Sequence, residues 1–275
     1  MTDHLYFAHA NSFPASVYHK MLGALSEHYT VSYTDCIGHD PAYPITDCWP
    51  RLVDQTIASV ERLGVGPVWA VGHSLGGILV LYAAVRRPDL FKGLAILDSP
   101  LFSRWRALTI WFAKRAGFID RITPGGNTLK RRNCWASTEM VHEYFGRKPM
   151  FARFDPDCLW DYARHGTVDD GQGGRQLKFH PTIEHRIYVT LPHDIAHCAD
   201  NNRVPGIYLA AGEHPVLTAR DQHYVRDRLG LTVGSHPGSH LFPLEQPLST
   251  AERIRLAFTA IETGAGVDTS TDRPK

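Results

Sequence analysis

Short apolar runs alternate with longer amphipathic stretches along most of the chain. The apolar runs cover residues 5–10, 31–37, 68–71, 93–97, 206–211 and 231–234. The stretches of helical length between and after them cover residues 15–28, 49–63, 78–85, 218–229 and 250–263. Strands that alternate with helices in this way predict an α/β fold, in which helices flank both faces of a mostly parallel sheet.

Residues 101–200 interrupt this alternation. They contain no comparable strand runs and instead show helical stretches at 105–116 and 138–145, separated by turns rich in proline and glycine. We therefore expect a core of residues 1–100 and 201–264 and a mostly helical insert at 101–200. The polar residues 265–275 are expected to form a flexible tail.

The insert also has its own composition. It holds 14 of the 29 aromatic residues, and residues 101–195 carry 15 Lys and Arg against 10 Asp and Glu, a net charge of +5 in a chain whose total is +1. An aromatic, mildly basic cap suits an acyl or aryl group and attracts a carboxylate or phosphate. A small helical unit also needs aromatic residues for its own core, so both interpretations stay open.

The overall composition excludes several classes of protein. A formal charge of +1 gives no general attraction to nucleic acid or an anionic membrane, and no apolar run is long enough to span a bilayer. The five cysteines are odd in number and scattered, which argues against a disulfide framework or a zinc site. With no secretory leader pattern, we expect a cytoplasmic protein without a nucleic-acid partner or membrane span. The oligomeric state is not indicated.

One serine stands in a pattern typical of a nucleophile. The segment Gly72-His73-Ser74-Leu75-Gly76 directly follows the apolar run 68–71 and precedes the helical stretch 78–85. A G-x-S-x-G pattern fits a sharp strand-to-helix turn, where glycines remove steric clashes and a helix N-terminus points at the serine. We predict that Ser74 is the nucleophile.

A serine nucleophile needs a histidine base, and here position must decide among sixteen histidines. His240 lies in a loop after the last predicted strand and before the last helix, at the carboxyl edge of the sheet beside Ser74. His236 is the rival but lies nearer the strand end. We favour His240 as the base.

Together these segments resemble the α/β-hydrolase superfamily over nearly the whole chain. Residues 7–14 (FAHANSFP) are similar to its oxyanion segment, and Ile37-Gly38-His39-Asp40 is similar to its Gly-His-Gly turn. The resemblance implies the α/β-hydrolase fold, with a helical cap inserted after the strand that follows the nucleophile turn. It also implies the chain order nucleophile, acid, histidine and no cofactor.

The acid is the position where the chain departs from the family. The commonest family position follows the strand 207–211, where this chain has Gly212-Glu213-His214-Pro215 and no aspartate. A second family position follows the strand after the nucleophile helix and corresponds to Asp98. We favour Asp98 and keep Glu213 as the alternative; an aspartate before Ser-Pro is also ordinary turn chemistry.

The resemblance also implies an oxyanion hole formed by backbone N–H groups. One belongs to Leu75, the residue after the nucleophile, and the other to Asn11, with Ser12 as the alternative. His9 is expected to brace that loop. The HDIAH sequence at 193–197 has no evident third ligand, so we predict no metal.

These expectations describe a cofactor-free serine hydrolase of the carboxylesterase or lipase type that cleaves a small-molecule carboxylic ester through an acyl-enzyme on Ser74. A thioesterase or a carbon–carbon bond hydrolase would use the same triad. A catalytically silent scaffold that binds a ligand is the alternative from a different class. The physiological substrate, acyl-chain preference and cap mobility stay open.

Overall fold

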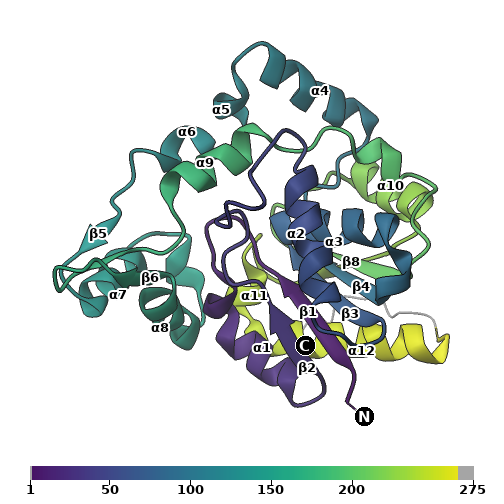
Figure 1. Cartoon of the computed structure of the whole chain (residues 1–275), viewed down its shortest axis with the longest axis horizontal. Helices are drawn as coiled ribbons and strands as arrows, with labels where there is room; N and C mark the ends of the chain where they lie inside the picture. The colour runs from purple at the N-terminus through teal and green to yellow at the C-terminus, as the bar shows by residue number, and fades with distance from the viewer. Residues whose placement is uncertain (1, 266–275) are drawn as a thin grey trace.

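A six-stranded parallel sheet forms the centre of the computed structural model, which describes residues 2–265 (Figure 1). Every neighbouring pair of its strands is parallel. The spatial order is β2 (Thr30–Tyr33), β1 (His4–Ala8), β3 (Val68–His73), β4 (Phe91–Leu97), β8 (Gly206–Ala211) and β9 (Thr232–His236). The predicted α/β class with a mostly parallel sheet is confirmed.

Helices cover both faces of the sheet (Figure 1). On one face lie α2 (Pro50–Glu61), α3 (Leu75–Arg86) and α10 (Ala219–Leu229), and on the other α1 (His19–Ser26) and α12 (Pro247–Thr263). The short helix α11 (Phe242–Glu245) precedes α12. Each strand contributes side chains to the hydrophobic cores on both faces of the sheet, because successive side chains point to opposite faces. In β1, Tyr6 packs on the α3 side and Phe7 on the α1 side.

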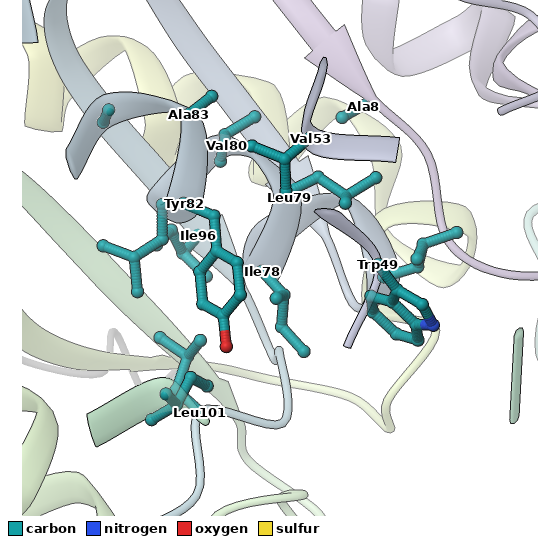
Figure 2. Close-up of a cluster of buried hydrophobic side chains, with 14 of the residues drawn as sticks. Ala8, Trp49, Val53, Ile78, Leu79, Val80, Tyr82, Ala83, Ile96 and Leu101 are labelled. Carbon is teal, nitrogen blue, oxygen red and sulfur yellow. The ribbon is translucent and has the colours of Figure 1, made fainter. Parts of the chain in front are cut away.

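The helix α3 is buried nearly all round, which explains its apolar sequence. Figure 2 shows Ile78, Leu79 and Val80 of this helix together with Val53 of α2 and Ala8 of β1. The packing holds the N-terminus of α3 directly behind the carboxyl ends of the strands, which is where the predicted nucleophile lies.

The segment between β4 and β8 forms six α-helices and lies over that end of the core (Figure 1). The helices are α4 (Arg104–Arg115), α5 (Ile119–Ile122), α6 (Gly125–Thr128), α7 (Thr138–Gly146), α8 (Pro156–His165) and α9 (Pro181–Val189). A small antiparallel sheet accompanies them, in the order β5 (Cys134–Trp135), β7 (Arg175–Leu177) and β6 (Thr167–Asp169). Strands of two or three residues are too short to show alternation, so this sheet was absent from the prediction.

None of the described helices combines the length and apolar character needed to cross a bilayer. The predicted flexible tail lies, from residue 266 onward, outside the described residues.

Candidate active site

Ser74 lies at a strained turn between β3 and α3. Its φ of 53° and ψ of −110° are a rare combination for a residue with a side chain. Two neighbouring glycines make the turn sterically feasible, because a Cβ at Gly72 would collide with the backbone of Gly76 and one at Gly76 with the carbonyl group of Ala8. The backbone N–H of Ser74 donates to the Leu97 carbonyl oxygen at 3.0 Å, which fixes the turn to β4.

His240 lies between Ser74 and Asp98. Its Nε2 is 3.1 Å from Ser74 Oγ, and its Nδ1 is 2.7 Å from Asp98 Oδ2. When Nδ1 carries the proton and donates to Asp98, Nε2 is left free to accept the proton of the serine hydroxyl. The structure therefore brings the three predicted catalytic residues together in one hydrogen-bonded chain.

Asp98 is fully buried, yet its carboxylate is well supplied with donors. The backbone N–H groups of Ala211 and Val216 donate to it at 3.2 and 3.3 Å, and the Tyr208 hydroxyl lies 3.5 Å away. These donors replace much of the water that burial removes. The carboxylate is held facing the His240 imidazole.

The alternative acid and the alternative base lie elsewhere. Glu213 is exposed, and its carboxylate forms two hydrogen bonds with Arg153 at 2.8 and 2.9 Å, which lower the pKa of this carboxyl group. His236 stacks on Phe242, and its Nδ1 is bonded to the Pro237 carbonyl oxygen. The structure brings neither residue to Ser74.

A second histidine, His73, supports the backbone of His240 and was not predicted from the sequence. His73 is fully buried, with Nε2 2.9 Å from the His240 carbonyl oxygen and Nδ1 2.8 Å from the Tyr18 hydroxyl. Burial, and next the nearby His240, lower the pKa of His73 well below its usual value, so the ring is neutral. Nε2–H then donates to the carbonyl group of His240 and fixes its backbone. Its place directly before the nucleophile was the available signal.

The predicted oxyanion residues adjoin Ser74. Leu75 is the first residue of α3, where N–H groups have no partner within the helix. The loop after β1 is tied to the same turn, because Gly76 N–H donates to the His9 carbonyl oxygen at 3.1 Å. Asn11 and Leu75 line the same cavity as Ser74, whereas Ser12 is not among its lining residues.

His9 lies beneath that loop. Its Nδ1 is 2.8 Å from the Ala10 carbonyl oxygen, and its Nε2 accepts a hydrogen bond from Ile37 N–H at 2.8 Å. The ring thus joins the loop after β1 to the turn at residues 37–40, which matches its expected bracing position. Complete burial is the main cause that lowers the pKa of His9 to about 4.

A cavity of about 460 Å³ opens above Ser74 and His240. Most of its wall is apolar and comes from the segment between β4 and β8. The other lining residues are Asn11, Trp49, Leu75, Pro100, Phe102, Arg106, Thr109, Ile110, Ile122, Thr123, Pro124, Ile187, Tyr188, Leu191 and Val216. The volume and character suit a small organic substrate.

Three residues near the cavity present metal-ligand atoms within 4.8 Å of one another, namely Asp47, Cys48 and His193. The Lys114 ammonium group already lies among them, paired with Asp47 and 3.1 Å from His193 Nδ1. A positive charge at this place opposes the binding of a cation. His193 is thus held by Lys114 and Cys48.

Comparison with known proteins gives a family match across most of the chain. Residues 5–253 match the profile described as "Alpha/beta hydrolase family". Among curated proteins, (E)-2-((N-methylformamido)methylene)succinate hydrolase of Acinetobacter baylyi is 30% identical over 127 residues, which are 44% of this chain and 48% of that protein. Pimeloyl-[acyl-carrier protein] methyl ester esterase of Xanthomonas campestris pv. campestris is 28% identical over 100 residues, which are 36% and 38%.

These matching segments span less than half of each relative. Among solved structures, E-2-(acetamidomethylene)succinate hydrolase superimposes with a TM-score of 0.71 at 20% identity, covering 94% of this chain and 92% of that one. At this level of identity the superposition shows a shared fold.

Proposed function

Because the chain belongs to the alpha/beta hydrolase family, we propose that it is a serine hydrolase that cleaves a carboxylic ester through an acyl-enzyme on Ser74. One observation carries the proposal: the hydrogen-bonded chain Ser74–His240–Asp98 opens into the cavity. The Xanthomonas relative is named as a methyl ester esterase, which supports an ester as the bond that is cleaved.

In the first half of the reaction, Ser74 Oγ attacks the ester carbonyl carbon while His240 Nε2 takes the hydroxyl proton. The carbonyl oxygen becomes an oxyanion, which accepts hydrogen bonds from the backbone N–H groups of Leu75 and Asn11. Asp98 stabilises the imidazolium that forms on His240. The intermediate then expels the alcohol, which takes its proton from His240.

In the second half, water replaces the alcohol. His240 removes a proton from this water, whose oxygen attacks the acyl-enzyme carbonyl carbon. Collapse of the second tetrahedral intermediate returns the proton to Ser74 Oγ and releases the carboxylic acid. No cofactor takes part in any step.

A fluorophosphonate probe tests the nucleophile. We expect the probe to label Ser74, with the modified peptide identified by mass spectrometry, and labelling to disappear in Ser74→Ala. Ser26→Ala changes an exposed serine and should keep full labelling. A folded protein that is not labelled at Ser74 would favour a silent binding scaffold and overturn the proposal.

A panel of 4-nitrophenyl esters from acetate to palmitate tests whether the bond that is cleaved is an ester. We expect turnover of the shorter members, because the cavity is small. Labelling of Ser74 without cleavage of any ester would overturn ester hydrolysis and favour a thioester or a carbon–carbon bond.

A further inference from the structure

We propose that Arg106 makes the cavity selective for esters that carry a carboxylate, an inference that rests on the proposed function and names its substrate class. Arg106 is the only lysine or arginine among the described residues that line the cavity, and no aspartate or glutamate lines it. In a mostly apolar cavity, a single cation attracts an anion more strongly than it would in water.

The guanidinium group of Arg106 is held in place before any ligand binds. It stacks on the ring of Phe102 at 4.0 Å from the ring centroid. Its Nη1 donates to the Val216 carbonyl oxygen at 3.0 Å and to Asp221 Oδ2 at 2.8 Å. A fixed arginine loses little conformational freedom when it binds a ligand.

These contacts leave part of the guanidinium group available. Both hydrogen bonds use Nη1, and within the described chain Nε and Nη2 donate to no protein acceptor. The side chain is 40% exposed. Two adjacent N–H groups of a guanidinium match the two oxygens of a carboxylate, which is the geometry the proposed substrate requires.

Asp221 pairs with Arg106 at 2.8 Å but also has other donors. Its side chain is 1% exposed and does not line the cavity, whereas Arg106 does, so the positive member of the pair is the one that a ligand in the cavity meets. The carboxylate is also bonded to Ser103 and Thr218, each of which donates both its backbone N–H and its hydroxyl group. Arg106 is therefore one of several donors to Asp221.

The position of Arg106 is coupled to the catalytic chain through one residue. Val216 accepts the Arg106 hydrogen bond with its carbonyl oxygen, while its N–H donates to Asp98. Arg106 and Asp98 are thereby held by the same residue. A change at Arg106 can also disturb Asp98, so the test must compare substrates within each variant.

The test uses two matched pairs of esters. In one, the carboxylate is on the acyl side: 4-nitrophenyl hydrogen adipate against 4-nitrophenyl hexanoate. In the other it is on the alcohol side: 4-carboxyphenyl hexanoate against 4-carbamoylphenyl hexanoate. We expect the wild type to prefer the anionic member of at least one pair in kcat/KM, by roughly ten- to a hundredfold, as for a charge-assisted hydrogen-bonded pair.

Arg106→Gln should abolish that preference, mainly through a higher KM for the anionic ester. Arg104→Gln removes the same charge from the same helix at a residue that does not line the cavity, and should leave the preference intact. A purely structural role of Arg106 would instead lower the rates of both members of a pair equally. Equal preference in wild type and Arg106→Gln would overturn the inference.

Binding to Ser74→Ala gives a readout that does not depend on turnover. By calorimetry, monomethyl adipate should bind at least about tenfold more tightly than methyl hexanoate, and Arg106→Gln should remove the difference. If the wild type cleaves none of the four esters, the proposed function fails, and this measurement alone decides the inference. Equal binding of the two methyl esters would overturn it.

Discussion

Asp98 has a backbone conformation that few aspartates adopt, with a φ of 37°. In this conformation its carboxylate accepts hydrogen bonds from the N–H groups of Ala211 and Val216 and lies 2.7 Å from His240 Nδ1. Strain of this kind persists where surrounding contacts hold it. At Asp98 those contacts come from the end of β8 and the loop after it, so Asp98 is positioned by a segment 113 or more residues away in sequence.

The first prediction concerns this acid. Asp98→Asn should lower kcat for an ester by on the order of 10⁴-fold, because the amide no longer selects the imidazole tautomer or stabilises the imidazolium. Glu213→Gln should retain at least roughly half of the wild-type rate, since that carboxylate pairs with Arg153. Steady-state kinetics on both variants, with circular dichroism to verify folding, make the measurement. A large loss in Glu213→Gln with an active Asp98→Asn would reverse the assignment.

A second prediction follows from the buried ring of His9, which must stay neutral so that Nε2 can accept from Ile37 N–H. Histidine in the unfolded chain titrates near pH 6.5, whereas burial lowers the pKa of His9 to about 4. Between about pH 6.5 and about pH 4, His9 is protonated in the unfolded chain but stays neutral in the native protein. The free energy of unfolding therefore decreases as the pH falls through this range. By linkage, the loss reaches about 3 kcal/mol.

Denaturant unfolding at pH 7.5 and pH 4.5 measures this effect. Between these values, wild type should lose about 2–3 kcal/mol more than His9→Gln, in which the titrating group is gone. His28→Gln replaces an exposed histidine and should follow the wild type. An unchanged pH dependence in His9→Gln would show that His9 is not the source.

For single residues, sequence patterns predict a role where that role depends on the conformation of the neighbouring backbone. Ser74 was predicted because its glycines are needed at one turn, and His240 because of its place after the last strand. Asp98 and Glu213 stayed unresolved, since β4 and β8 are neighbours and both end at the same edge of the sheet. Arg106 was missed, because its approach to the cavity depends on how the insert folds back over the core.

At the scale of elements, the close approach of α3 to β1 depends on the absence of a side chain at Gly76. A Cβ there would collide with the backbone of Ala8, which cannot move without disturbing its pairing with β3. Gly23 in α1 offers the opposite case, because it is exposed and no atom lies within 4 Å of an added Cβ. The same substitution should therefore have opposite effects at the two positions.

The third prediction compares these glycines. Gly76→Ala should destabilise the fold by about 3 kcal/mol or more, because backbone must shift to admit a methyl group. Gly23→Ala should stabilise it by about 0.5–1 kcal/mol, because alanine loses less conformational entropy in a helix. Chemical denaturation of both variants tests the pair. Similar stability of Gly76→Ala and wild type would contradict the packing described for the turn.

The regular elements of the core were predictable because its strands, except β4, are each followed by a helical stretch of the core. All six strands of the large sheet overlap apolar runs in the sequence. The sheet β5-β7-β6 has no such signal, since its strands are two or three residues long. Pairing between residues some forty positions apart, such as Cys134 with Gln176, leaves no periodic trace.

At the scale of the whole molecule, one aromatic cluster joins the core to the segment between β4 and β8. Phe13 lies between β1 and α1. The centroid of its ring is 6.0 Å from the ring centroid of Phe151 and 5.6 Å from that of Tyr162. Phe145 packs on the same two rings at 4.6 and 4.8 Å. Much of the aromatic content of the insert therefore contributes to a core shared with the sheet.

The last prediction is that the described parts unfold as a single cooperative unit. Trp49 and Trp69 are buried in the core and Trp135 is buried in the insert, so in a variant with Trp49→Phe and Trp69→Phe the fluorescence change on unfolding reports on the insert, whereas far-ultraviolet circular dichroism reports on the whole chain. Phe151→Ala should shift both denaturation curves together by about 3–5 kcal/mol, because it opens a cavity in the shared cluster. Phe112→Ala removes a side chain that is 58% exposed and should change stability by no more than roughly 0.5 kcal/mol. Fluorescence and dichroism midpoints that separate in the variant lacking Trp49 and Trp69 would mean that the insert folds independently of the sheet, and the shared cluster would then not couple the two.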